Sequence, residues 1–66
     1  MEPKEIFELI VKADERLKYS TEANAALRRT QATEFLMQAL AEARAIGNEP
    51  LVEQARTRLR DLGVEM

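Results

Sequence analysis

Glycine and proline are rare in this chain of 66 residues, and their positions constrain its fold more than any other feature. The prolines are Pro3 and Pro50, and the glycines are Gly47 and Gly63, so residues 4 to 46 contain neither type. Because these two residue types are the strongest local breakers of regular structure, we expect long uninterrupted elements between them. Alanine and leucine supply most of the apolar residues, and this composition favours helices over strands.

Apolar residues recur every three to four positions and predict helices over about residues 3–18, 22–46 and 50–62. Pro3 and Pro50 suit the first turn of a helix, where the missing N–H would have no partner. Gly47 and Gly63 suit the left-handed residue that follows a helix, and Val64 is placed for the apolar contact that often accompanies such an end. The sequence therefore predicts an all-α fold, an antiparallel three-helix bundle that forms a single domain over residues 1–66.

The break between the first two helices is predicted without a glycine, in "KYSTEAN" at residues 18 to 24. Ser20 and Thr21 are candidate N-caps, and Glu22 would lie in the first turn of the next helix. The alternative is one continuous helix from residue 3 to residue 46. Such a helix would exceed the usual length of roughly 8 to 20 residues, and no heptad pattern supports it as a coiled coil, so a tight turn is preferred.

The second predicted helix carries two apolar stripes that are slightly out of phase. The early stripe contains Ala23, Ala26, Leu27 and Thr30, and the later one contains Ala32, Phe35, Leu36, Ala39, Leu40 and Ala43. This drift predicts that the first half of the helix contacts the first helix and that the second half also contacts the third.

Composition excludes several classes of chemistry. The chain has no cysteine and no histidine, so disulfides, thiolate metal sites and the commonest general base are absent. Glu34 and Glu42 align on the second helix, but a di-metal bundle would also need histidine ligands. Ser20, Thr21, Thr30 and Thr33 lack a histidine base that could activate a nucleophile. We therefore predict no catalytic residue, no metal site and no cofactor.

Charge and length limit the partners and the location. The formal net charge is −2, so no overall positive field attracts nucleic acid. The longest uncharged run is too short to cross a bilayer, and the acidic start does not resemble a signal peptide. A cytoplasmic protein without a membrane partner is the expectation. A chain this small buries only about 60% of its unfolded surface, so stabilisation by a second chain is expected.

Part of the chain resembles the tetratricopeptide repeat (TPR), a family of helical hairpins. Ala32, Leu36 and Ala39 have the small, large, small spacing of the second helix of that repeat. Leu59, Leu62 and Gly63 are similar to the large residue and the Leu-Gly pair of its first helix. The resemblance covers residues 32 to 63 and implies close helix packing through alanine. "KADERLKY" and the helix number show a lesser similarity to the microtubule-interacting and trafficking domain.

The departures from the TPR pattern bear on what the chain can be. Residues 17 to 24 lack the expected Leu-Gly-x-x-Tyr core, and no period repeats along the whole chain. Because a solenoid needs about three repeats for stability, the chain is either TPR-like and self-associating or a plain three-helix bundle.

The preferred functional hypothesis is a protein–protein interaction or self-assembly module, a homo-oligomer or the partner of another helical protein. An apolar flank that exceeds the needs of a small core would form its contact surface, with arginines fixing orientation at the rim. The candidate interface residues are Phe7, Ile10, Val11, Arg28, Arg29, Phe35 and Met37.

The alternative hypothesis is a small regulatory protein that associates with nucleic acid through arginines. Its candidate residues are Arg28, Arg29, Arg56, Arg58 and Arg60. Arg56 and Arg60 share one side of the third helix, whereas Arg58 points about 160° away from them. Pairing of these arginines with Glu53 and Asp61 in solvent is the simpler interpretation of this cluster.

Overall fold

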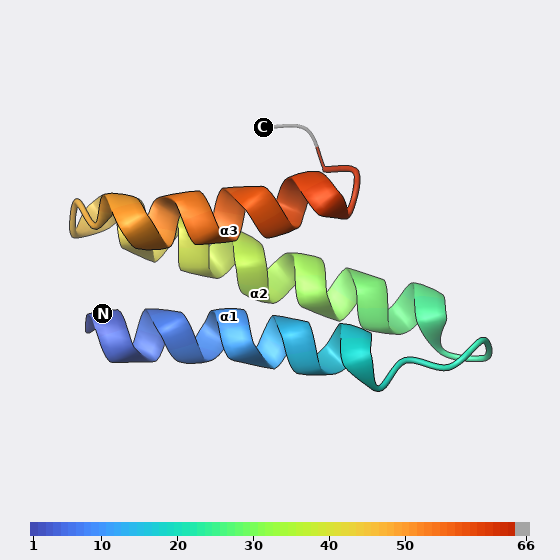
Figure 1. Cartoon of the computed structure of the whole chain (residues 1–66). Coiled ribbons are helices and arrows are strands. Elements are labelled where there is room, and N and C mark those ends of the chain that lie inside the picture. Colours follow the sequence, from blue (N-terminus) through green and yellow to red (C-terminus); the bar gives the residue numbers. More distant parts are fainter. Residues whose placement is uncertain (65–66) are drawn as a thin grey trace.

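The structure is a computed structural model that describes residues 1–64, and within them it contains three helices and no strand. Helix α1 spans Pro3–Lys18, α2 spans Ala25–Ala45 and α3 spans Glu49–Asp61 (Figure 1). The prediction of an all-α, three-helix architecture is confirmed.

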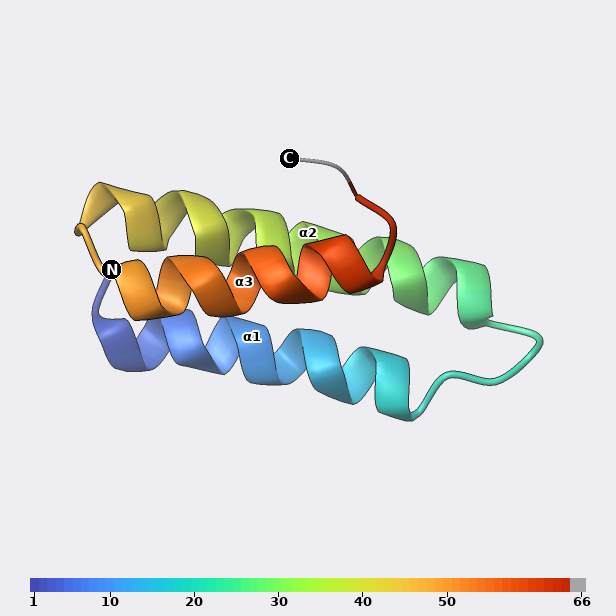
Figure 2. The same cartoon turned by 45° about the horizontal axis from the view of Figure 1, so that its top comes forward.

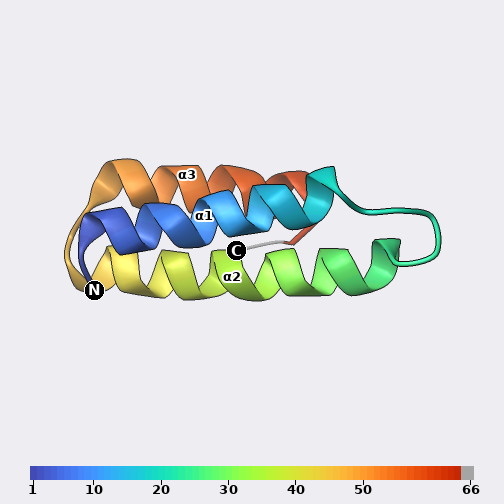
Figure 3. The same cartoon turned by 90° about the horizontal axis from the view of Figure 1, so that it is seen from below.

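Helices α1 and α3 both pack on α2, which is the central helix of the three. Helices α1 and α3 run parallel to each other and antiparallel to α2 (Figures 1 and 2), and both lie on the same side of α2 when the molecule is seen from below (Figure 3). Each of them packs extensively on α2, and they contact each other much less. The molecule is elongated, measuring 37 × 23 × 13 Å. One side of α1 therefore has no helix against it.

The core lies along the line where α2 meets its two neighbours. Alanines let the helix axes approach closely, and larger isoleucine and leucine side chains fill the space between them. The buried residues are Ile6, Ile10, Ala13, Ala32, Leu36, Ala39, Leu40, Ala43, Leu51, Val52, Ala55 and Leu59. All of them are apolar, and none of the described polar side chains is fully buried.

The corner between α2 and α3 is formed by local hydrogen bonds. Gly47 adopts a φ of +68°, and its N–H donates to the carbonyl of Arg44 at 3.1 Å. The N–H of Asn48 donates to the carbonyl of Ala43 at 2.9 Å, which completes a Schellman motif. The Asn48 side chain then accepts a hydrogen bond from the N–H of Leu51 at 3.2 Å and caps α3. The predicted stop and restart at this corner are confirmed.

The end of α3 repeats this arrangement. Gly63 has a φ of +81°, and its N–H donates to the carbonyl of Arg60 at 2.9 Å. The N–H of Val64 donates to the carbonyl of Leu59, also at 2.9 Å, and its side chain packs against the core. The predicted apolar contact of Val64 is confirmed.

The turn between α1 and α2 is present, but the predicted caps were wrong. Helix α2 begins at Ala25, three residues after the predicted start, and Asn24 is the N-cap residue. The side-chain oxygen of Asn24 accepts from the N–H of Thr21 at 2.6 Å, while the Ser20 hydroxyl donates back to the carbonyl of Leu17 at 2.8 Å. Residues 21 to 24 thus form a separate turn.

The first turns of α2 extend beyond the end of α3, as Figure 1 shows. The early apolar stripe predicted for this region was wrong: Ala26, Leu27 and Thr30 are exposed, and 60% of the Leu27 surface is open to solvent. The core stripe that contains Ala32 and Leu36 continues backward to Arg28 at helical spacing, which places Leu27 on another side of the helix.

Candidate functional site: the outer surface of α1

An apolar pair lies on the outer side of α1, away from the core. Phe7 follows the buried Ile6 in the chain. Because each residue of an α-helix is rotated by about 100° from the one before, the Phe7 side chain points away from the core that Ile6 contacts. Phe7 is 47% exposed although its ring is a large apolar group, and Val11 one turn later is half-buried.

Four charged residues surround this pair. Together with Phe7 and Val11 they line a shallow, mainly apolar depression, and these six residues are called the α1 surface here: Lys4, Phe7, Glu8, Val11, Lys12 and Glu15. All four charged side chains are exposed, and none of them makes an ion pair with another described residue. The charges are therefore free to contact a partner.

A second depression adjoins the first at the seam between α1 and α2. It is lined by Lys12, Glu15, Arg16, Tyr19, Arg28 and Phe35. The guanidinium carbon of Arg16 lies 5.9 Å from the centre of the Phe35 ring, within the range of a cation–π contact. Because Lys12 and Glu15 line both depressions, the seam and the α1 surface are continuous.

Two polar atoms of α2 are left without partners at this side of the molecule. The Nε atom of Arg28 and the Oε1 atom of Gln31 are buried and form no hydrogen bond with any described residue. Such groups lose their hydration without compensation, which costs roughly 1–3 kcal/mol each. Arg28 lines the seam together with Phe35, and Gln31 lines a neighbouring depression that also includes Phe35.

The predicted interface residues do not form one surface. Phe7 and Val11 lie together on α1, while Arg28 and Phe35 lie in the seam. Met37 is 44% exposed on α2 and lines neither depression. Ile10 was wrongly placed on an exposed flank: it is 0% exposed because it lies on the stripe of Ile6 and Ala13 that contacts α2.

The arginines of the alternative hypothesis point toward different elements. Arg58 pairs with Asp14 of α1, with its Nε atom 3.0 Å from Oδ1, and Arg56 pairs with Glu53 at 3.6 Å. Arg29 donates to the carbonyl of Leu62 at 2.6 Å. The predicted pairing with Glu53 is confirmed, whereas no arginine within residues 1–64 forms the predicted ion pair with Asp61. Three of the five candidate arginines are thus engaged within the molecule.

The residues of the seam that sequence reasoning missed are Lys12, Glu15, Arg16 and Tyr19. They stand in "KADERLKY", and their spacing of three, four and seven residues from Lys12 places them near one side of a helix. That spacing alone could have grouped them, but it does not indicate that Phe35 and Arg28 of α2 lie against them.

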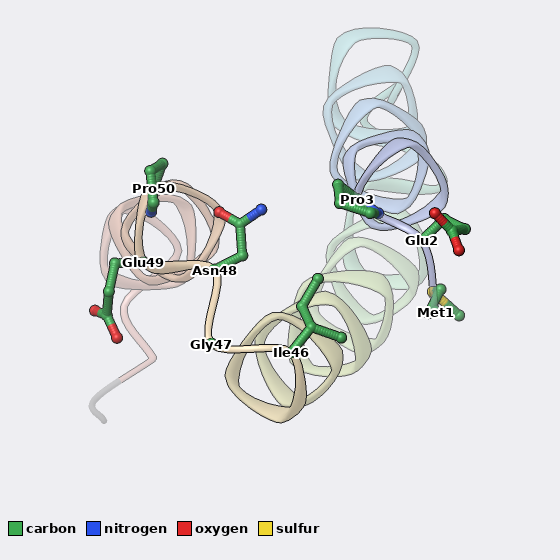
Figure 4. Close-up of a pocket in the computed structure, with 8 residues that line it drawn as sticks. All are labelled: Met1, Glu2, Pro3, Ile46, Gly47, Asn48, Glu49 and Pro50. Carbon is green, nitrogen blue, oxygen red and sulfur yellow. The ribbon is translucent and has the colours of Figure 1, made fainter.

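A third depression lies where the N-terminus meets the corner after α2, and it offers little chemistry. Figure 4 shows Pro3, Ile46 and Asn48 directed toward the space between α1 and α3, while Glu49 points away. Its lining residues include no cationic side chain, and the Asn48 side chain is already used as a cap.

The described residues form a small all-α domain with an open surface on its first helix. Within them, no group of three or more acidic side chains is arranged to hold a metal ion. None of the three helices is long and apolar enough to cross a membrane, as judged over the same residues. Comparison with protein-family models, curated proteins and solved structures gave no match.

Proposed function

We propose that this chain is a non-enzymatic protein–protein interaction module whose contact surface is the outer side of α1. The observation that carries the proposal is the exposure of Phe7 beside Val11, within a mainly apolar depression bordered by charges. Aromatic side chains are among the residues that interfaces favour, and polar groups lie mainly at the rim of an interface. The TPR-like relationship and the cytoplasmic location stay predictions beside this proposal.

Energetics favour a partner on this surface. Covering apolar area releases roughly 25 cal/mol per Å², and Phe7 holds a large exposed area that the core does not use. The rim charges would contribute mainly to orientation and specificity rather than to affinity. A small domain with a thin stability margin gains further from burial of such a surface. The partner is expected to be a second copy of the chain or a helix of another protein.

Substitution of Phe7 tests this surface. We expect Phe7→Ala to weaken self-association about tenfold, as loss of a central aromatic contact does in other interfaces, and to leave the helical fold intact. Sedimentation equilibrium over a series of concentrations up to hundreds of micromolar measures the change, and circular dichroism measures the fold.

Met37→Ala is the matched control, because Met37 is 44% exposed but lies outside the α1 surface. We expect this variant to associate like the wild type. A wild-type protein that stays monomeric over the whole series would contradict self-association, and equal losses in the two variants would contradict the choice of surface.

The nucleic-acid hypothesis stays an alternative prediction. It requires binding of DNA or RNA that weakens steeply as the salt concentration rises. The intramolecular contacts of Arg29, Arg56 and Arg58 give it less support than the exposed apolar pair gives the interaction module.

A further inference from the structure

The charges of the α1 surface alternate in sign along the helix. Lys4, Glu8, Lys12 and Glu15 follow one another from the N-terminal to the C-terminal end. Residues spaced by four, four and three positions stay near one side of an α-helix, and positions 4 and 15 differ by only about 20° around the axis. Among the four charged residues that line this surface, the order of signs is positive, negative, positive, negative.

This order is self-complementary when the helix direction is reversed. Resting on the proposed function, we infer that α1 binds α1 of a second copy in antiparallel orientation. Lys4 then lies opposite the partner's Glu15, and Glu8 lies opposite the partner's Lys12. In a parallel pair in register each charge would meet its own sign, which costs stability. The charge pattern thus favours the antiparallel pair over the parallel pair in register.

The centres of the two charge pairs and of the apolar pair lie within one residue of each other. The midpoint of positions 4 and 15 is 9.5, that of positions 8 and 12 is 10, and that of positions 7 and 11 is 9. A twofold axis that crosses α1 near these centres pairs all four charges and brings Phe7 against the partner's Val11. A twofold interface of this kind uses the same residues in both chains and closes at a dimer.

The remaining contacts of α1 leave this side open. Ile6, Ile10 and Ala13 face the core, and Asp14 is held by Arg58 of α3. The four charges of the α1 surface make no ion pair within residues 1–64. A second copy can therefore approach without displacing an existing contact. One helix from each chain forms an interface smaller than that of a standard stable complex, so the dimer is expected to be weak and sensitive to salt.

Charge reversal tests the pairing. Lys4→Glu places a carboxylate opposite the partner's Glu15, and Glu15→Lys places an ammonium group opposite the partner's Lys4. By the twofold symmetry each single variant has two repulsive contacts. We expect each to weaken its own dimer about tenfold, as measured by sedimentation equilibrium at low salt, with circular dichroism as the control for folding.

Rescue makes the test specific. An equimolar mixture of the Lys4→Glu and Glu15→Lys proteins, one of them fluorescently labelled, is expected to form a mixed dimer about as strong as the wild type, because every facing pair is again opposite in sign. The double variant K4E/E15K is expected to recover self-association for the same reason. A role of Lys4 or Glu15 in folding alone would not produce rescue in the mixture.

The outcomes separate this inference from the proposed function. If the wild type associates but the single variants associate equally well, the antiparallel α1 pairing is overturned and an interaction module using another contact remains. Single variants that weaken without rescue in the mixture also overturn it. A wild type that stays monomeric overturns the pairing together with self-association.

Discussion

At the scale of single residues, the backbone conformation of Gly47 shows how local chemistry ends a helix. Its φ of +68° lies in the left-handed region, where a side chain with a Cβ atom is strained. A Cβ atom built there would meet no other atom within 4 Å, so the requirement for glycine is conformational and not steric crowding.

We expect Gly47→Ala to lower the free energy of unfolding by about 1 kcal/mol, because alanine tolerates the left-handed conformation poorly. Gly47→Asn should cost less, since asparagine is the next most frequent residue at this position of a helix end. Urea unfolding of the three proteins measures the order. Equal stability of the alanine and asparagine variants would contradict the conformational explanation.

At the scale of helices, one ion pair joins the two elements that otherwise contact each other least. The guanidinium Nε of Arg58 on α3 donates to both carboxylate oxygens of Asp14 on α1, at 3.0 and 3.1 Å. The side chain of Arg58 also donates to the carbonyl of Gln54 at 3.2 Å, which restrains its direction. The pair thus forms a polar link between α3 and α1.

A double-mutant cycle with Asp14→Asn and Arg58→Gln should give a coupling of about 0.2–1 kcal/mol, because both side chains are partly exposed and solvent screens the pair. We expect the coupling to shrink as salt is raised. The pair of Glu53 and Arg56 within α3 is the control, and its longer distance of 3.6 Å predicts a smaller coupling. A coupling that salt does not change would exclude a mainly electrostatic link.

At the scale of the whole molecule, stability depends on a short list of buried apolar side chains. A domain of this length is expected to unfold with a free energy of roughly 3–10 kcal/mol. Leu36 is fully buried in the core, near the middle of α2. Truncation of its side chain is therefore expected to remove a large fraction of the total free energy of unfolding.

Leu36→Ala is expected to lower the free energy of unfolding by about 2–5 kcal/mol, through lost burial and the cavity that remains. Leu27→Ala is the matched control on the same helix, and its 60% exposed side chain predicts a change within about 0.5 kcal/mol. Thermal or urea unfolding measures both. If the two variants lost similar free energies of unfolding, the Leu27 side chain would have to be buried, which would contradict the exposed first turns of α2.

The candidate site was only partly predictable from the sequence. Phe7 and Val11 could be grouped because four residues make about one helical turn, and their neighbours in the chain carry the charges of the same surface. Ile10 was assigned to that flank because the apolar side of α1 is wider than the core that covers it. The placement of α2 decides which part of this wide apolar side is buried, and periodicity carries no information on that placement.

The sequence by itself determined the number of helices and the corner at Gly47, because caps, left-handed glycines and the 3.6-residue period act over a few neighbouring residues. Only the tertiary structure decided that Ile10 is buried while Phe7 is open, that Arg58 pairs with Asp14, and that Arg16 covers Phe35. These contacts join residues far apart in the chain, so they depend on how the helices pack around α2. Because the neighbouring helices cover only the side of α1 that carries Ile6, Ile10 and Ala13, the packing leaves the α1 surface without a neighbour.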